Sequence, residues 1–250
     1  MLTEERRKKI IALLDQHSIL KSQDLISLLN ASESTIRRDL QELENAGLLE
    51  RVHGGAKRPQ YLEQELGMAE KSFKNVQQKQ AIARLAADYV ADGDVIYLDA
   101  GTTTLEMIPF LKGKAITAVT NSVGLAARLV EQEINTIVLG GRIKLTTDAV
   151  LGTQATDQLA NYRFNKAFMG MNGVHVEHGF TTPDTEEALL KRLAMDHAQE
   201  AFVLVDYSKF NQVSFSRVAQ LEAGTILTDK CPLLIYDKIK ELTTIKEVTV

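Results

Sequence analysis

Residues 22–56 read SQDLISLLNASESTIRRDLQELENAGLLERVHGGA, and this stretch decides the fold of the N-terminal part of the chain. It contains two segments with apolar residues at helical spacing, which Asn30-Ala31 separate. A short strand-like segment that ends in His53-Gly54-Gly55 follows them. Two helices joined by a tight turn and followed by a hairpin are typical of a winged helix-turn-helix, whose second helix can enter the major groove of DNA. We therefore expect residues 1–57 to form a winged helix-turn-helix DNA-binding domain.

The helix ends and the buried face of this domain can be predicted from spacing. We expect Ser22 and Ser32 to act as N-caps, and Gly47 to end the second helix of the motif in the left-handed conformation. A strand should follow over residues 48–52. Side chains at helical spacing on three helices should face inward: Ile10, Leu13, Leu14, Leu25, Leu28, Leu29, Ile36, Leu40 and Leu43.

The outward face of the second helix of the motif is rich in hydroxyl groups and arginines. Short hydroxyl side chains permit close approach to bases, and an arginine can bind a guanine edge through two hydrogen bonds. The residues that we expect to contact DNA are Ser32, Glu33, Ser34, Thr35, Arg37 and Arg38 on this helix, and Arg51 and His53 in the wing. The alternative is a three-helix domain that binds protein and whose two adjacent arginines are merely solvated.

The overall composition limits where and how the chain can act. The net charge is −4 over 250 residues, with +1 in residues 1–58 and −5 in the remainder, so DNA binding must depend on local placement of arginine and lysine. The single cysteine, Cys231, cannot form a disulfide within the chain, which fits a reducing cytoplasm, and we expect it to be structural. The N-terminus lacks an apolar signal core, and no apolar run approaches the ~18 residues of a membrane span. A cytoplasmic protein without a membrane partner is predicted.

Strand and helix patterns alternate from about residue 77 onward. Pro59 and a polar composition predict a linker over residues 58–75. Helices are predicted at 77–90, 103–111, 122–132, 153–160 and 185–199, and strands at 95–98, 116–119, 136–139, 166–169, 201–205 and 225–227. Apolar strands that alternate with helices indicate a parallel sheet covered on both faces, a Rossmann-like α/β domain over residues 76–250.

Glycine and hydroxyl residues follow several of these strands. The first such segment, Asp99-Ala100-Gly101-Thr102-Thr103-Thr104, leads into a helix, where hydroxyls and backbone N–H groups can hold a phosphate. No GKS or GKT follows it, so a nucleotide is not predicted. Thr120-Asn121-Ser122 and Gly140-Gly141-Arg142 should lie along the same sheet edge, where open α/β folds bind ligands. Residues 170–173, 179–183 and 206–210 continue this pattern, and Lys209 among them can reach a phosphate.

The stretch STIRRDLQELENAGLLERVHGGA resembles the signature of the DeoR-type bacterial repressors almost position by position, and the resemblance extends over nearly the whole chain. In that family the helix-turn-helix binds operator DNA, and the C-terminal sensor domain binds a phosphorylated sugar and is similar in fold to ribose-5-phosphate isomerase. DAGTTT, TNS, GG and DYSKF match the sensor motifs of the family. The resemblance implies effector binding at Asp99, Gly101, Thr102, Thr103, Thr104, Asn121, Ser122, Gly140, Gly141, Arg142, Asn172, Thr181, Glu186, Lys191 and Lys209.

Within the family, the chain looks most similar to the fructose operon repressors of Gram-positive bacteria, which implies fructose 1-phosphate or a related hexose phosphate as the effector. The leading hypothesis is a repressor of a sugar-utilisation operon that the phosphorylated sugar releases from its operator. The alternatives are a sugar-phosphate isomerase-like enzyme with an accessory DNA-binding module, and the same regulator acting as an activator. Because a helix-turn-helix dimer binds paired half-sites, we expect a homodimer or homotetramer built through the sensor domains.

Two further chemistries are disfavoured by the residues present. An isomerase needs paired aspartates for acid–base catalysis, and residues 170–184, GMNGVHVEHGFTTPD, do not supply them, so we expect no enzyme activity and no cofactor. His175 and His178 lie in a segment between two glycines where no third ligand with a supporting pattern is visible. The segment is therefore expected to be a polar surface loop, with no metal.

Overall fold

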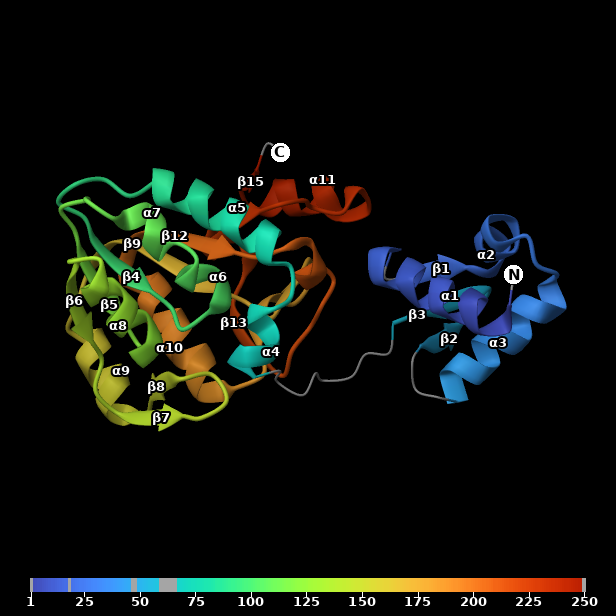
Figure 1. Ribbon diagram of the computed structural model, residues 1–250, viewed down its shortest axis with the longest axis horizontal. Helices are drawn as coiled ribbons and strands as arrows, with labels where there is room; N and C mark the ends of the chain where they lie inside the picture. Colours follow the sequence, from blue (N-terminus) through green and yellow to red (C-terminus); the bar gives the residue numbers. More distant parts are fainter. Residues whose placement is uncertain (1, 18, 46–48, 59–66, 249–250) are drawn as a thin grey trace. The chain divides into compact units, whose positions relative to one another are not determined.

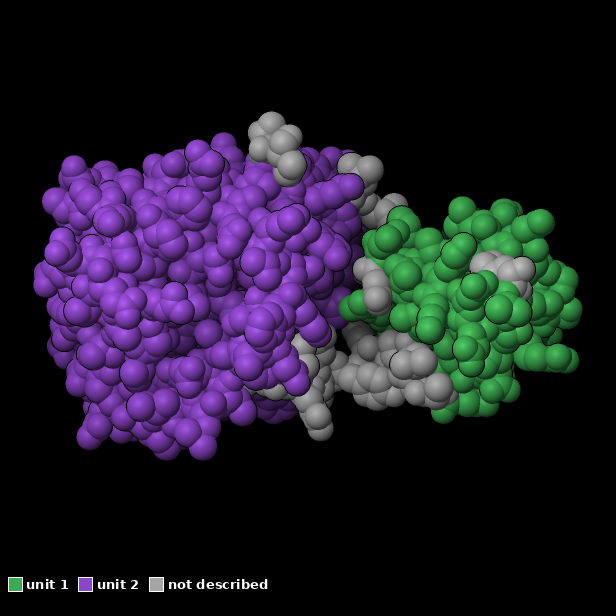
Figure 2. Space-filling model, in the orientation of Figure 1, with its two compact units in different colours: residues 1–61 green, residues 62–250 purple. Residues whose placement is uncertain are grey.

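The computed structural model describes residues 2–17, 19–45, 49–58 and 67–248. The chain divides into two compact units, residues 1–61 and residues 62–250, which Figure 2 shows in different colours. Of the linker expected over residues 58–75, residues 59–66 lie outside the described residues. Residues 67–75 are described and belong to the larger unit.

The smaller unit has the three helices and the wing expected from the sequence. Its helices are α1 (Thr3–His17), α2 (Ser22–Leu29) and α3 (Glu33–Asn45), and its strands are β1 (Ile19–Lys21), β2 (Glu50–Val52) and β3 (Gly55–Lys57). The strands form an antiparallel sheet in the order β1-β3-β2. Leu25 on α2 and Ile36 on α3 are fully buried in a core that both helices share with α1. A glycine is required at position 55, because a Cβ there would collide with the backbone of Leu20 on β1.

Two details of this unit differ from the prediction. Leu28 is 64% exposed, because Leu25 and Leu29 already occupy the inward face of α2. Ser22 is the first residue of α2 rather than its cap, and Lys21 precedes it without a side-chain cap. The backbone N–H of Ser22 instead donates to the carbonyl of Gly54 at 2.8 Å, so the wing satisfies the helix end. Gly47, expected as a helix cap, and Leu48 lie outside the described residues.

The larger unit is built on a seven-stranded sheet, parallel throughout, in the order β15-β14-β12-β9-β4-β5-β6. Its strands are β4 (Val95–Leu98), β5 (Thr117–Thr120), β6 (Asn135–Val138), β9 (Phe164–Gly170), β12 (Ala198–Leu204), β14 (Thr225–Thr228) and β15 (Ile245–Glu247). The predicted parallel α/β fold is therefore confirmed. β6 is an edge strand, so Ile137 and Val138 are 40% and 47% exposed rather than buried.

Helices cover both faces of this sheet, as α5 and α10 illustrate in Figure 1. The buried residues fall into two clusters, one containing Ile82 and Leu125 and the other Leu159 and Leu190. The first cluster lies under α5 (Val76–Asp88), α6 (Thr102–Leu105), α7 (Ile108–Leu111) and α8 (Val123–Glu131), and the second under α9 (Thr153–Ala160), α10 (Thr185–Asp196) and α11 (Leu233–Leu242). The single helix expected over residues 103–111 is two short helices, and Pro109, which has no backbone N–H to donate, lies at the start of the second.

Three segments expected to be loops or linker contain regular structure. Helix α4 (Met68–Ser72) lies within the expected linker. Strands β7 (Arg142–Lys144) and β8 (Ala149–Leu151) form a hairpin where Gly140-Gly141-Arg142 was expected as a loop. Strands β10 (Gly173–His175), β11 (Gly179–Thr182) and β13 (Ser216–Ala219) form a third small sheet. Helix α4 and the small sheets lack the long hydrophobic period that marks the main elements in the sequence.

Candidate functional site

Helix α3 presents the surface expected to meet DNA. Ser32 caps the helix, because its hydroxyl accepts the N–H of Thr35 at 3.2 Å and also lies 2.8 Å from the Thr35 hydroxyl. Arg37 and Arg38 are exposed, and among the described residues neither has an ion-pair partner. Two unpaired guanidinium groups on an exposed helix face are available for phosphates and base edges.

A buried carboxylate holds α3 against α1. Asp39 accepts from Arg6 Nε at 2.5 Å and from Arg7 Nε at 3.0 Å, and its side chain is 2% exposed. In the wing, Arg51 donates to the side-chain oxygen of Gln41, which ties β2 to α3. His53 lies exposed at the turn between β2 and β3. The two arginines expected on α3 are therefore free at the surface, whereas Arg51 is partly engaged within the unit.

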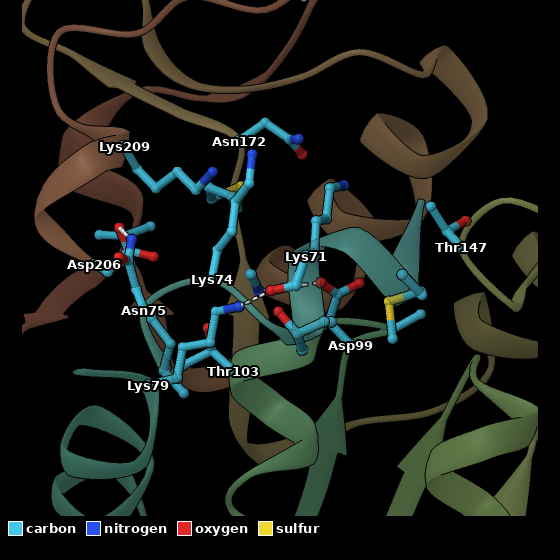
Figure 3. A pocket seen from close by; sticks show the side chains of 18 of the residues that line it. Lys71, Lys74, Asn75, Lys79, Asp99, Thr103, Thr147, Asn172, Asp206 and Lys209 are labelled. Carbon is cyan, nitrogen blue, oxygen red and sulfur yellow. Dashed lines mark hydrogen bonds between the residues drawn. The ribbon is translucent and has the colours of Figure 1, made fainter. Parts of the chain in front are cut away.

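The larger unit has a pocket at the carboxyl ends of its central strands (Figure 3). The segments after β4, β9 and β12 form one part of its wall, and α4 with the start of α5 forms the other. The side chains and backbone that line it belong to Met68, Lys71, Lys74, Asn75, Lys79, Asp99, Ala100, Gly101, Thr102, Thr103, Thr147, Gly170, Met171, Asn172, Glu187, Lys191, Leu204, Val205, Asp206, Ser208 and Lys209.

The base of the pocket is a buried ion pair. The Lys191 ammonium donates to an Asp99 carboxylate oxygen and to the carbonyl of Gly170, the latter at 3.0 Å. The same Asp99 oxygen accepts the N–H of Gly170 at 3.0 Å. The two side chains are 5% and 3% exposed, so this pair fixes the loop after β4 to the end of β9 and to α10. Asp99 is thus neutralised and holds the loop that carries Thr102 and Thr103.

Cationic side chains outnumber anionic ones around the pocket, with five lysines against three carboxylates. Burial lowers the pKa of Lys79, and the ammonium of Lys209 lowers it further, against the opposing charge of Asp206. The Lys79 ammonium donates to the backbone carbonyl of Lys71. The hydroxyls of Thr102 and Thr103 complete a cavity suited to a small anion with polar substituents.

Most of the chain matches two known domain families. Residues 6–61 match the DeoR-like helix-turn-helix domain, and residues 74–230 match the DeoR C terminal sensor domain. The chain belongs to the DeoR family of transcriptional regulators. The helix-turn-helix of this DeoR-family regulator is its DNA-binding unit, and the pocket lies in its sensor. The prediction of a regulator rather than an enzyme is confirmed by this assignment.

Relatives of this DeoR-family regulator match it over nearly their whole length. The uncharacterized HTH-type transcriptional regulator FruR of Bacillus subtilis is 49% identical over 99% of both chains. A lactose phosphotransferase system repressor of Staphylococcus epidermidis is 31% identical over 94% of this chain and 96% of the relative. A solved ribose-5-phosphate isomerase A of Methanocaldococcus jannaschii is 22% identical over 55% of each chain, with a TM-score of 0.42.

Within the described part of the regulator, every helix is too short or too polar to cross a membrane.

The sensor brings seven of the expected effector residues to the pocket: Asp99, Gly101, Thr102, Thr103, Asn172, Lys191 and Lys209. Three others support the pocket loop or its neighbour from behind. The Thr104 hydroxyl donates to the carbonyls of Asp99 and Gly101 at 2.7 and 2.8 Å. The Asn121 side chain accepts the N–H of Ala100 at 3.0 Å, and Ser122 caps α8. These three side chains shape loops rather than line the cavity.

The remaining five expected residues lie outside the pocket: Gly140, Gly141, Arg142, Thr181 and Glu186. Arg142 and Glu186 pair with each other at the surface, and their side chains are 63% and 47% exposed. Gly141 has a φ of 152° and lies against the carbonyl of Leu151, as the β7–β8 hairpin requires. The Thr181 hydroxyl accepts the N–H of Ser214 at 2.9 Å within the small sheet. Each of these residues has a structural role that the sequence pattern does not distinguish from ligand binding.

Several lining residues were not expected, and five of them come from the predicted linker and the start of α5. Lys71, Lys74 and Asn75 belong to that segment, which the sequence marks only by lysines at positions 71, 74 and 79. Glu187 lies on α10, where it accepts from Thr147 at 2.8 Å and from Lys144 at 3.1 Å. Asp206 lies in the DYSKF segment, but only Lys209 of that segment was expected to bind.

The segment between β10 and β11 is a surface loop, as expected, in which Glu177 and His178 are exposed. The structure brings a third donor, Glu177, to the two histidines, and the ligand atoms of His175, Glu177 and His178 lie within 4.8 Å of one another. The Nδ1 atom of His175 accepts the N–H of Glu177 at 3.1 Å. Burial and the neighbouring His178 lower the pKa of His175.

Cys231 is buried, and burial raises the pKa of its thiol to about 12, in keeping with a structural role.

Proposed function

We propose that this DeoR-family regulator represses a sugar-utilisation operon in the cytoplasm and leaves its operator when a phosphorylated sugar binds the sensor pocket. Fructose 1-phosphate is the first candidate, because the chain resembles fructose operon repressors. The observation that carries the proposal is the excess of lysines over carboxylates around a pocket with a glycine–threonine loop. A phosphoryl group supplies the missing negative charge, and the polar wall suits sugar hydroxyls. The relative that is a lactose phosphotransferase system repressor supports repression and a sugar signal.

Control of DNA binding requires that the two ligands favour different states of the protein. If the sugar phosphate lowers the affinity for the operator, the operator must lower the affinity for the sugar phosphate by the same factor. This reciprocity can be measured without knowing the operator's position relative to a promoter.

We also propose that the regulator is a homodimer or homotetramer held through its sensor units. Strand β6 supports this part of the proposal, because it is a sheet edge with exposed Ile137 and Val138, and Val130 on the adjacent α8 is 63% exposed. Edge strands with apolar residues are usually covered in soluble proteins. Light scattering should give a multiple of the chain mass, and a monomer at micromolar concentration would contradict this part.

The decisive experiment measures release from DNA. The full chain is bound to a fluorescent operator selected from random DNA and is titrated with fructose 1-phosphate, fructose 6-phosphate, glucose 6-phosphate, unphosphorylated fructose and inorganic phosphate. One sugar phosphate should release the DNA and raise the melting temperature, whereas fructose should do neither. Lys209→Ala and Thr103→Ala should remain on the operator in the presence of that sugar phosphate. Normal release by both variants would refute the pocket as the effector site.

A further inference from the structure

The segment that follows the DNA-binding unit enters the sensor as a wall of its pocket. Helix α4 is the first described element after residues 59–66, and it is anchored at its start by the N–H of Met68, which donates to the carbonyl of Thr146 at 2.9 Å. The neighbouring Thr147 donates to Glu187 on α10 at 2.8 Å. Helix α4 is therefore fixed to the β7–β8 turn and, through that turn, to the helix that carries Lys191.

A sharp turn after α4 directs the chain past the pocket. Asn75 has a φ of 53°, in the left-handed region that asparagine tolerates better than most residues. Its side-chain nitrogen donates to Asp206 at 3.0 Å, which fixes the turn to the segment after β12. As a result Lys74, immediately before the turn, and Lys79, one turn into α5, line the same cavity as Lys209 (Figure 3).

These three lysines differ from Lys191 in how their charge is balanced. Lys191 is paired with Asp99, whereas Lys74 and Lys209 have no hydrogen bond or ion pair from their ammonium groups to any residue that the structure describes. Lys79 donates only to a neutral carbonyl, that of Lys71 on α4. The neighbouring carboxylate, Asp206, is already engaged by Asn75 and by the hydroxyl of Ser208 at 2.5 Å. Three ammonium groups thus face one cavity without a dedicated counter-charge.

We propose that Lys74, Lys79 and Lys209 form a phosphoryl subsite, so that the effector's phosphate binds partly to the segment that leads to the DNA-binding unit. This inference rests on the proposed function and adds to it the residues that bind the negatively charged phosphoryl group of the ligand. Phosphoryl oxygens compete with the Lys71 carbonyl for the Lys79 ammonium, and they pair with the Lys74 ammonium, which already lines the cavity. The position of α4 then depends on occupancy. Two residues of the subsite come from outside the glycine–threonine loop and the DYSKF motif.

Affinity measurements with the full chain test the subsite. The probes are fructose 1-phosphate, fructose 6-phosphate, glucose 6-phosphate and inorganic phosphate, measured by titration calorimetry. Lys74→Ala should weaken binding of the sugar phosphate by roughly tenfold to a hundredfold, as expected for loss of a charge-assisted hydrogen bond. Lys74→Arg should restore most of the affinity, because it keeps the charge. Lys238→Ala, on the exposed face of α11, makes the same change of charge away from the pocket and should bind as the wild type does.

The outcomes separate this inference from the proposed function. If the wild type binds a sugar phosphate and Lys74→Ala binds it equally well, the subsite is overturned while the proposed function stands. If the wild type binds none of the three sugar phosphates, the proposed function fails for them, and inorganic phosphate decides the subsite. The subsite is then supported if inorganic phosphate raises the melting temperature of the wild type but not that of Lys74→Ala. If inorganic phosphate does not raise the melting temperature of the wild type, the subsite is overturned.

Hydrogen exchange tests the link to α4. Amides of residues 68–74 should exchange at least about threefold more slowly, or more rapidly, when the sugar phosphate is bound to the wild type, since their contact with Lys79 changes. The effect should be smaller in Lys74→Ala at saturating ligand, because Lys79 alone then links the phosphate to α4, and this variant should be released from the operator less completely. An exchange rate of α4 that does not respond to ligand in the wild type would overturn the link.

Discussion

The DNA-binding unit displays its basic side chains, whereas the sensor encloses its own. Arg37 and Arg38 lie exposed on α3, while Lys191 is 5% exposed and paired with Asp99. A charge on the outside can be removed without disturbing the fold, but a charge inside is part of the fold. Sequence motifs for binding therefore have different meanings in the two units: on α3 they mark exposed side chains, and in the sensor they mark a mixture of pocket-lining residues and scaffold.

A buried carboxylate accepts from two donors in each unit, Asp39 in the DNA-binding unit and Asp99 in the sensor, but the surroundings of the two differ. Asp39 is held by Arg6 and Arg7, whose side chains are 12% and 31% exposed. The partner of Asp99 is as deeply buried as Asp99 itself. The arginines of the DNA-binding unit can regain water if their partner is removed, and Lys191 cannot.

The largest effect is expected for Asp99→Asn. It leaves the Lys191 ammonium buried without a counter-charge, so the free energy of unfolding of the sensor should fall by about 3–5 kcal/mol. Urea unfolding followed by circular dichroism measures the loss. Asp237→Asn, on the exposed side of α11, is the matched control and should change little. The double variant Asp99→Asn/Lys191→Met should recover part of the loss; an additive loss in the double variant would show that the pair is not coupled.

Arg37→Ala and Arg38→Ala should each weaken operator binding and leave the fold intact. A guanidinium that contacts a base edge contributes about 1–3 kcal/mol, which is roughly 5- to 150-fold in affinity. Fluorescence anisotropy with the selected operator measures the change, and Lys238→Ala controls for the altered net charge. Wild-type affinity for the operator in both variants would show that α3 is not the recognition helix. A large drop in melting temperature would contradict the contrast between the units.

Asp39→Ala should destabilise the DNA-binding unit less than Asp99→Asn destabilises the sensor. The two arginines can be rehydrated, so we expect a loss of about 1–2 kcal/mol. Calorimetry of the full chain should show a lower first transition and an unchanged sensor transition. A loss as large as that of Asp99→Asn would mean that Arg6 and Arg7 depend on this carboxylate as strictly as Lys191 depends on Asp99.

The smallest effect is a pH dependence from His175. Burial and the nearby His178 lower the pKa of His175 below its ordinary value of 6.5. The unfolded chain therefore binds a proton at this residue more readily than the folded chain does, and the free energy of unfolding should decrease as the pH falls below about 6.5. His175→Gln should show a flatter decline in melting temperature between pH 7.5 and pH 5.5. If the melting temperatures of the wild type and of His175→Gln decline equally with pH, the pH dependence does not come from His175.

The sequence predicted those parts of the molecule whose cause is local. The helices around Leu25, Ile36 and Ile82 and six of the seven strands of the main sheet follow from a hydrophobic period, and the Ser32 cap follows from one residue at a helix start. Strand β15 and helix α11 were not predicted. Helix α4 could not be found in this way. It has five residues, too few to be stable alone, and contacts with Thr146 and Lys79 hold it in place.

The candidate site was predicted as a set of residues but not as a geometry. Asp99 and Lys191 were both expected, yet nothing local indicates that residues 92 positions apart form one ion pair. Gly141 and Thr181 belong to patterns that serve a hairpin and a sheet as readily as a ligand, and the structure assigns them to those elements. Sequence patterns therefore pointed to the sheet edge at which the pocket lies, but not to all the residues that line it.

The attachment of α4 to the sensor determines how the chain should be divided in the laboratory. A truncated sensor that starts at residue 76, where strand–helix alternation becomes regular, would keep the pair of Asp99 and Lys191 but lose Lys71 and Lys74. Such a fragment should fold and yet give misleadingly weak hits in a metabolite screen. Chimeric regulators that exchange one DNA-binding unit for another should be joined upstream of Gly67, so that each sensor keeps its own helix α4.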